Sequence, residues 1–280
     1  MGSKPPDETV DSYVMGRTSE EYQRLRRQAK VWETSTVQLL RRVGLREGMS
    51  CLDVGCGPGE TMRLMGETVG RAGNVVGLDV DGKLGHEMLG VLKASGESNY
   101  SFLEGDVQEI DEVAGERFDV TFARLLLLHM QDPVGVLRKL YAWTKPGGYV
   151  VVQDYDFRTM DAYPRFEAYD EYDKVFFGVY EKSGRDTRVG SKLPVFFVDA
   201  GIGPPDGTDV AGHLMPFEQA GGMVKAVYRS VLPRALQLGI TTEARSQAFL
   251  KEMDEGTGEG YYSFLWPLLI GAWKRKTPQS

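Results

Sequence analysis

The sequence predicts an α/β protein in which helices cover both faces of a doubly wound, mostly parallel sheet. Three observations favour this class. Short apolar runs alternate with helix-like segments between residues 49 and 156. The runs are continuously apolar, which is typical of strands buried on both faces. The first run ends in a glycine cluster, and ligands bind at such carboxyl ends of strands in doubly wound sheets.

Five strands are expected in this core, each a short apolar run bounded by polar residues or glycine. Gly85 and Gly90 weaken the second of the intervening helices. A turn over Pro146, Gly147 and Gly148 is expected before the fifth strand. The strands cover about 50–54, 74–80, 100–103, 118–123 and 149–154, and the helices include 60–69, 83–93 and 133–143.

A helical arm is expected before this core and a helical lid after it. The four residues from Thr18 have the spacing of a capping box, and a helix extends from them toward Trp32. Pro164 is expected to open a helix with an aromatic stripe, which is interpreted either as a buried face or as the wall of an acceptor pocket. Pro233 is expected to kink or split a later helix.

Two terminal strands are expected to finish the sheet as an antiparallel pair, giving seven strands of which the last is antiparallel. They lie at about 209–215 and 261–273, with helices at about 223–238 and 244–253 between them. The expected organisation is an arm at 1–45 and a core at 46–280, with lid insertions at about 157–206 and 216–258.

The composition limits which classes of binding partner are expected. The net charge of -7 and the pI near 5.2 disfavour nucleic acid and anionic membranes as partners. The two cysteines, Cys51 and Cys56, provide neither a disulfide framework nor the ligand spacing of a zinc site. No apolar leader opens the chain, and the most apolar run, at 264–273, is too short to span a bilayer. A cytoplasmic protein is expected, and a homo-oligomer remains open.

The most specific motif is the decapeptide CLDVGCGPGE, which begins at residue 51. Its glycines, Gly55, Gly57 and Gly59, allow backbone amides to approach a ligand closely. A dinucleotide fingerprint needs a third glycine where this chain has Glu60, and a pyrophosphate there would meet a carboxylate. A nicotinamide oxidoreductase is therefore disfavoured. The carboxylate of Asp53 instead suits a ligand that carries a positive amine.

The second motif is GLDVD at residues 77–81. Asp79 ends the second strand about 20 residues after the glycines, where an acidic residue bonds the ribose hydroxyls of an adenosine ligand. Val80 is placed to lie against the adenine. The alternative interpretation is that Asp79 only caps the following helix.

Three further motifs follow in order: GDV at 105–107, the segment FDVTFARLLLLHMQDP at 118–133, and LRKL with KPGGY at 137–149. Together the five motifs, which cover about 49–156, resemble those of class I S-adenosylmethionine-dependent methyltransferases. The small-molecule branch is the most similar, with its ubiquinone and menaquinone C-methyltransferases and many microbial natural-product enzymes. The resemblance implies a Rossmann-like fold, S-adenosylmethionine as cofactor and S-adenosylhomocysteine as product.

The resemblance also assigns site residues. Asp106 matches the aspartate that takes the exocyclic amine of adenine, and Arg124 is a candidate partner for the methionine carboxylate, although a surface role is open. Ala123 and Arg124 stand where magnesium-dependent members carry a metal-binding aspartate, so no metal is expected. The expected cofactor-binding residues are Asp53, Gly55, Gly57, Gly59, Asp79, Val80, Asp106, Val107, Ala123 and Arg124.

The expected activity is methyl transfer to a small, largely apolar metabolite at oxygen, nitrogen or carbon, with a neutral or cationic acceptor favoured. The candidate catalytic residues are His129 as a base, Asp154 at the end of the fifth strand, and Tyr22 on the arm. Each also has a structural interpretation, in which His129 only forms hydrogen bonds beside a helix start, Asp154 only caps a turn, and Tyr22 only packs against the core. The alternative function is a cyclase that binds the cofactor on the same fold without transferring methyl.

Overall fold

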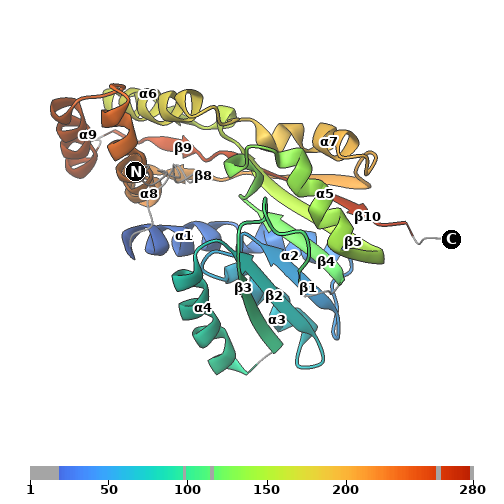
Figure 1. Ribbon diagram of the computed structural model, residues 1–280. Helices are drawn as coiled ribbons and strands as arrows, with labels where there is room; N and C mark the ends of the chain where they lie inside the picture. Colours follow the sequence, from blue (N-terminus) through green and yellow to red (C-terminus); the bar gives the residue numbers. More distant parts are fainter. Residues whose placement is uncertain (1–18, 97–98, 114–116, 257–259, 278–280) are drawn as a thin grey trace, which may run out of the picture.

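The computed structural model describes residues 19–96, 99–113, 117–256 and 260–277. The expected capping box begins at Thr18 and lies outside the residues whose side chains are described. Figure 1 shows a sheet flanked by helices, with a helical roof over one end of it. Among the described residues, no helix combines the length and the apolar character needed to cross a membrane.

The main sheet confirms the predicted fold class. It has seven strands in the order β3-β2-β1-β4-β5-β10-β7, and β10 alone runs against its neighbours β5 and β7. Leu52 pairs with Val76 on one side and with Thr121 on the other, so β1 lies at the centre of the parallel part. The strands are β1 (Ser50–Val54), β2 (Asn74–Asp79), β3 (Asn99–Glu104), β4 (Phe118–Arg124), β5 (Thr144–Asp156), β7 (Gly207–Ala211) and β10 (Leu268–Arg275).

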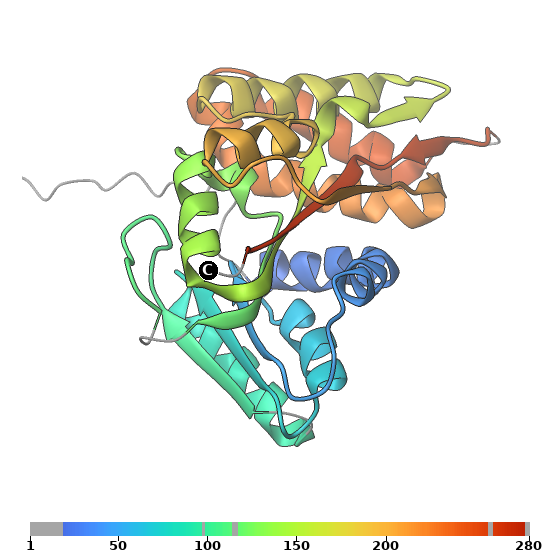
Figure 2. The same cartoon turned by 90° about the vertical axis from the view of Figure 1, so that its right-hand side faces the viewer.

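Helices cover both faces of this sheet, because successive strand residues point to opposite sides. Val150 and Val152 of β5 belong to the same apolar cluster as helices α5 and α7, whereas Val151 belongs to the cluster that contains α2, α3 and α4. Figure 2 shows the helices on either side of the sheet. The helices are α2 (Glu33–Arg42), α3 (Glu60–Val69), α4 (Gly82–Ser95), α5 (Pro133–Trp143) and α7 (Val189–Asp199).

The two expected terminal strands do pair antiparallel, but each is interrupted. Gly212 and His213 separate β7 from β8 (Leu214–Pro216), and Trp266 and Pro267 separate β9 (Ser263–Leu265) from β10. Proline has no N–H to give to a ladder, so pairing stops at Pro267. The outer pieces join β6 (Asp161–Tyr163) in a second sheet of order β6-β9-β8.

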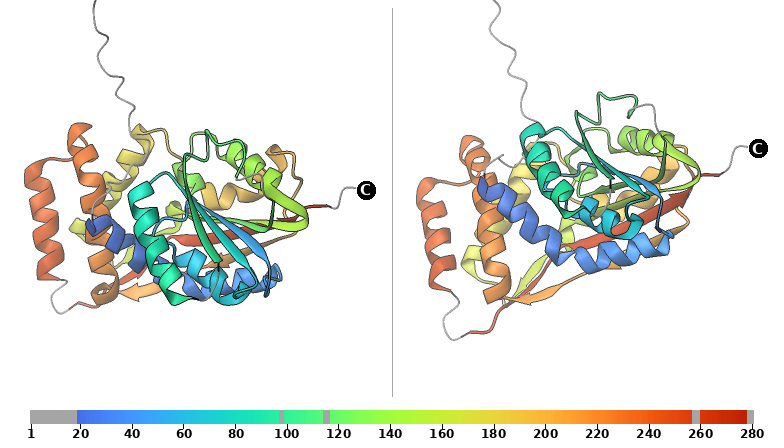
Figure 3. Two further views of the ribbon diagram at one scale, coloured as in Figure 1. Left: turned by 60° about the horizontal axis from the view of Figure 1, so that its bottom comes forward. Right: turned by 90° about the horizontal axis from the view of Figure 1, so that it is seen from below.

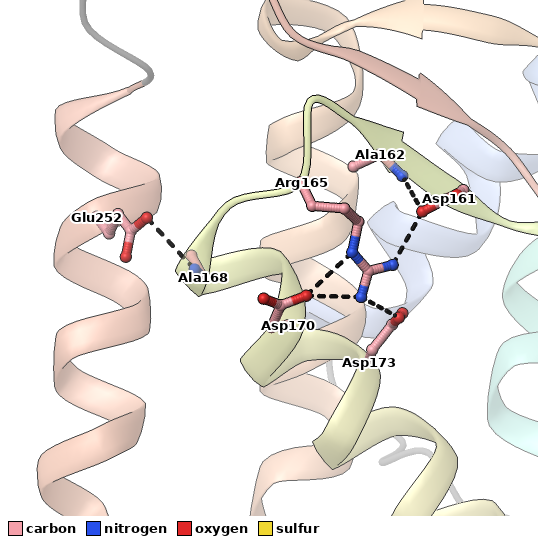
Figure 4. Close-up of polar contacts among 7 residues, drawn as sticks. All are labelled: Asp161, Ala162, Arg165, Ala168, Asp170, Asp173 and Glu252. Carbon is pink, nitrogen blue, oxygen red and sulfur yellow. Dashed lines mark hydrogen bonds and ion pairs between the residues drawn. The ribbon is translucent and has the colours of Figure 1, made fainter.

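A roof, formed by this small sheet with α6 (Glu167–Lys182), α8 (Phe217–Gln237) and α9 (Glu243–Glu255), lies over the carboxyl ends of the parallel strands. Figure 4 shows Arg165 where β6 passes into α6, within 2.9 Å of Asp161, 2.6 Å of Asp170 and 2.9 Å of Asp173. The backbone N–H of Ala168 donates to Glu252 of α9 at 3.3 Å. These polar contacts fix the start of α6 within the roof.

Four local expectations are corrected. The helix expected at Pro164 begins three residues later, at Glu167, and α8 continues through Pro233 without a break. The expected turn at 146–148 is instead an irregularity within β5, where the pairing with β4 shifts register. The sequence analysis missed α7, which contains Pro194. The arm is two helices, α1 (Ser19–Val31) and α2, divided at Trp32.

Trp32 explains how the arm packs. Its side chain is 0% exposed and lies in the same apolar cluster as Leu52 and Val54 of β1. The right-hand view of Figure 3 shows α1 and α2 following one another along one side of the molecule. Helix α1 contacts α3 below it and α8 of the roof above it. It therefore closes one side of the space between the sheet and the roof.

Candidate active site

A cavity of about 730 Å³ lies at the carboxyl ends of β1, β2 and β4, bounded by α1 and by the roof. This volume falls within the range of small-molecule sites. Its lining divides into two ends. The end beside β1 and β2 carries carboxylates and glycines, and the other end carries aromatic side chains with His129.

The glycine motif forms the floor of the first end. Gly55 and Gly57 line the cavity with φ of 70° and 48°, a conformation that side chains rarely adopt. A Cβ on Gly57 would meet no atom within 4 Å, so its backbone is open to a ligand. Gly59, also left-handed, caps α3 outside this cavity, and a Cβ there would clash with Met88.

Asp79 lies directly beside this floor. Its Oδ2 accepts from Gly57 N at 2.8 Å and its Oδ1 accepts from Asp81 N at 2.9 Å, which fixes the carboxylate at the end of β2. Asp81, rather than Asp79, caps α4 by accepting from Leu84 N at 3.0 Å. The helix-cap alternative therefore belongs to Asp81, and Asp79 faces the cavity.

The arm closes over the same strand end. Tyr22 Oη donates to Asp81 Oδ2 at 2.5 Å, linking α1 to the turn after β2 across 59 residues of sequence. Val80 lines the cavity with 49% of its surface exposed, as suits a side chain that packs on a planar ring. Asp106 lines the cavity after β3, and its Oδ1 accepts from Gln108 N at 2.8 Å in a local turn.

An acidic and a basic side chain in the cavity lining, Asp53 and Arg124, influence each other's ionisation. Burial raises the pKa of Asp53 to about 7, and the nearby Arg124 guanidinium opposes that shift. Arg124 donates to Thr36 Oγ1 at 2.9 Å, and Thr36 donates to Gln153 at 2.8 Å. Helix α2 and strand β5 thus hold Arg124 in place. Both Asp53 and Arg124 line the cavity.

Three expected residues besides Asp154 lie away from the cavity lining. Val107 and Ala123 are buried in the apolar cluster under α5, because their side chains point away from the strand ends that face the ligand space. Gly59 lies beyond the floor, as described above. The structure brings together Tyr22, Asp53, Gly55, Gly57, Asp79, Val80, Asp106, Arg124 and His129.

Asp154 is likewise absent from the lining. It is 0% exposed, and its carboxylate accepts from Leu128 N at 3.2 Å and from Tyr155 N at 2.9 Å. Burial raises its pKa to about 7. The structure therefore gives it a positioning role: it holds the short helix η1 (Leu127–His129) that carries His129.

His129 itself lines the cavity at the end of η1. Burial, together with the positive charges of Arg185 and Arg24, lowers its pKa to about 3. This pKa lies well below the ordinary value of 6.5, so His129 is a much weaker base than its expected role requires. The imidazole is neutral across the physiological range, where it can accept a hydrogen bond but is a weak base.

Sequence analysis missed the polar group at the second end of the cavity. Tyr155 directly follows Asp154, and its hydroxyl contacts Gln28, Trp32 and Trp266. Its position at the end of a core strand was the available signal. Among the described residues, no group of three or more His, Cys, Asp or Glu side chains is arranged to hold a metal ion.

Comparison with known proteins agrees with this geometry. A methyltransferase domain model matches residues 45–184, half of the chain. A demethylmenaquinone methyltransferase of Lactococcus lactis is 31% identical over 176 residues, which cover 62% of this chain and 68% of the relative. A solved candidate methyltransferase of Bacillus halodurans has a TM-score of 0.59 at 16% identity, covering 87% of this chain and 99% of that one.

A second solved structure, which contains bound ligands, has a similar fold. Phosphoethanolamine N-methyltransferase 2 of Haemonchus contortus, in complex with phosphomonomethylethanolamine and S-adenosylhomocysteine, has a TM-score of 0.50 at 16% identity. The alignment covers 88% of this chain and 53% of that one. Fold and site define a class I S-adenosylmethionine-dependent methyltransferase of the small-molecule branch. The chain belongs to the methyltransferase domain family.

Gly57 allows a test of the cofactor floor. Gly57→Ala should weaken S-adenosylhomocysteine binding at least tenfold by calorimetry, because the new methyl occupies open space above the backbone. Gly48→Ala is the matched control: its φ of 79° imposes similar strain, its Cβ also meets nothing, and it lies outside the cavity. Equal affinities in the two variants would remove Gly57 from the binding floor.

Proposed function

We propose that this methyltransferase modifies a small, largely apolar metabolite of natural-product biosynthesis, at an oxygen, nitrogen or carbon atom. One observation carries the proposal: a single cavity joins a carboxylate and glycine end to an aromatic end. The aromatic end contains Phe157, Phe176 and Tyr172. These rings favour a planar or apolar acceptor over a highly polar one.

The residues of the first end fit S-adenosylmethionine. The open backbone at Gly57 provides the cradle, Asp79 is placed for ribose hydroxyls, and Asp106 for the adenine amine. Asp53 and Arg124 together suit the ammonium and carboxylate of an amino acid. The bound cofactor supplies an activated methyl group. The chain's contribution is to align the acceptor and to exclude water.

Two further residues complete the proposed machinery. His129, neutral in its buried position, accepts a hydrogen bond from the hydroxyl or amine of the methyl acceptor and so aligns it with the methyl group. Tyr22 acts as a latch, since its bond to Asp81 holds α1 over the cofactor end. On this proposal the arm is the movable lid of the site, and the roof is its fixed cover.

Product analysis tests the function. The enzyme is incubated with S-adenosylmethionine carrying a labelled methyl group and with a panel of aromatic and polyketide-like acceptors, and products are resolved by mass spectrometry. Label in an acceptor together with stoichiometric S-adenosylhomocysteine supports transfer. Isomerisation of an acceptor without label or S-adenosylhomocysteine would instead identify a cyclase.

Asp53 makes cofactor binding depend on pH. The ionised carboxylate attracts an ammonium group and the protonated one does not, so binding below the Asp53 pKa of about 7 costs a proton release. S-adenosylhomocysteine affinity should therefore rise by up to tenfold per pH unit toward pH 7 and then level off. Calorimetry of Asp53→Asn should give weaker binding with a flat profile. A retained slope in this variant would place the titrating group elsewhere.

A further inference from the structure

The hydroxyl of Tyr155, at the second end of the cavity, is surrounded by hydrogen-bond donors. Its hydroxyl oxygen receives Trp32 Nε1 at 2.5 Å, Gln28 Nε2 at 3.0 Å and Trp266 Nε1 at 3.3 Å. These donors come from the arm and from the link between β9 and β10, which are distant in sequence. All three converge on one phenolic oxygen.

None of the three can take the proton of Tyr155. An indole nitrogen is only a donor, which settles Trp32 and Trp266. The amide of Gln28 has both a donor and an acceptor, but a neighbour fixes its orientation. Arg24 Nη1 lies 2.5 Å from Gln28 Oε1, and a guanidinium can only donate. The oxygen of Gln28 therefore faces Arg24, and its NH2 faces Tyr155.

This arrangement leaves the Tyr155 hydroxyl able to donate a hydrogen bond but not to accept another one. A neutral phenol has two lone pairs, and three N–H groups already compete for them. Burial raises the pKa of Tyr155, so the group keeps its proton. Among the described residues, no acceptor for that proton lies within hydrogen-bond distance, and Tyr155 lines the cavity. The O–H is thus a donor without an internal partner.

We propose that Tyr155 recognises the methyl acceptor by donating its hydroxyl proton as a hydrogen bond to an oxygen of that molecule. The inference rests on the proposed function and narrows its substrate class. The ligand is an aromatic or conjugated molecule that carries a carbonyl, ether or phenolic oxygen. Phe157 lies with its ring centroid 5.2 Å from that of Tyr155, so an apolar frame is accommodated beside the polar contact.

The sequence predicted a neutral or a cationic acceptor, and the proposal retains only the neutral one. A cationic acceptor brings N–H donors, and at Tyr155 these would meet a group already supplied with donors. A ligand oxygen instead completes the hydrogen bonding of a buried polar group. The second end of the cavity therefore selects against ammonium acceptors.

Two probes of nearly equal shape test the proposal on the full chain with S-adenosylhomocysteine present. These are 2-acetylnaphthalene, which has a ketone oxygen, and 2-isopropenylnaphthalene, which has a methylene in its place. The wild-type enzyme should favour the ketone, and Tyr155→Phe should reduce that preference about tenfold. The carbonyl stretch of the labelled ketone should move to lower wavenumber only on the wild-type enzyme.

Two more variants separate recognition from packing. Gln28→Glu keeps the hydroxyl but places a carboxylate where it can accept the Tyr155 proton, so the ketone preference should fall as in Tyr155→Phe. Tyr149→Phe makes the same change on the same strand outside the cavity lining and should leave the preference intact.

Several outcomes would overturn the inference: equal preference in wild type and Tyr155→Phe, no binding of either probe, or a tyrosinate absorbance at neutral pH that Tyr155→Phe removes. S-adenosylhomocysteine affinity is measured separately in every variant. If the wild-type enzyme does not bind S-adenosylhomocysteine, the proposed function is rejected. If Tyr155→Phe still binds S-adenosylhomocysteine but loses the preference for the ketone, recognition by Tyr155 is supported.

Discussion

His129→Ala is expected to slow methyl transfer by about a hundredfold, because the acceptor loses the hydrogen bond that aligns it with the methyl group. The affinity for S-adenosylhomocysteine should stay within about twofold, because His129 lies at the acceptor end of the cavity. Single-turnover rates with a transferred acceptor, corrected for the folded fraction, measure the effect. A rate that is unchanged per folded molecule would make the histidine structural.

The pH dependence provides an independent check on His129. Its pKa is lowered to about 3, so protonation of this imidazole should not produce an acid limb near pH 6.5 in the wild-type profile. A limb near pH 6.5 that disappears in His129→Ala would contradict the burial of this side chain. A limb near pH 7 that survives His129→Ala is compatible with Asp53, which titrates there.

Asp79→Ala is expected to weaken S-adenosylhomocysteine binding by about ten- to a hundredfold, as unpaired ribose hydroxyls cost about 1.5–3 kcal/mol. The change also removes the acceptor for Gly57 N, which loosens the cofactor floor. Calorimetry measures the loss, and circular dichroism confirms the fold.

The matched control for Asp79 is Asp81→Asn. It removes a negative charge from the same turn, keeps one acceptor oxygen for Leu84 N, and places an NH2 group that can donate to the Tyr22 hydroxyl oxygen. A loss below about threefold is expected. If the two variants lose affinity equally, general charge rather than the position of Asp79 determines binding.

The core and the cofactor end could be predicted from local sequence for a physical reason. Continuous apolar runs report strands that are buried on both faces, and in a parallel sheet their carboxyl ends converge. Asp53 and Asp79 lie near the ends of such runs, and Gly57 and Asp106 follow them, so their order along the chain implied that they meet in one cavity. Val107 and Ala123 follow the same rule by position, yet their side chains point into the core.

The remaining features depend on partners that are distant in sequence. The pKa of His129 is set by burial and by Arg24 and Arg185, which lie on other elements. Local sequence likewise does not show the convergence of Trp32 and Trp266 on Tyr155. The interruption of the terminal strands depends on β6, a three-residue strand without an apolar run of its own, which takes β9 as its partner.

The small sheet has a consequence for how ligands enter and leave. Each of its three strands continues a strand of the main sheet: β6 follows β5 through the short helix η2 (Phe157–Thr159), β8 follows β7, and β9 runs into β10. Three short backbone connections thus join the roof to the main sheet and restrict its movement relative to that sheet. Helix α1 has one backbone connection to the described part of the chain, at Trp32, and reaches the turn after β2 through Tyr22. We therefore expect ligands to enter and leave on the α1 side, while the roof stays in place.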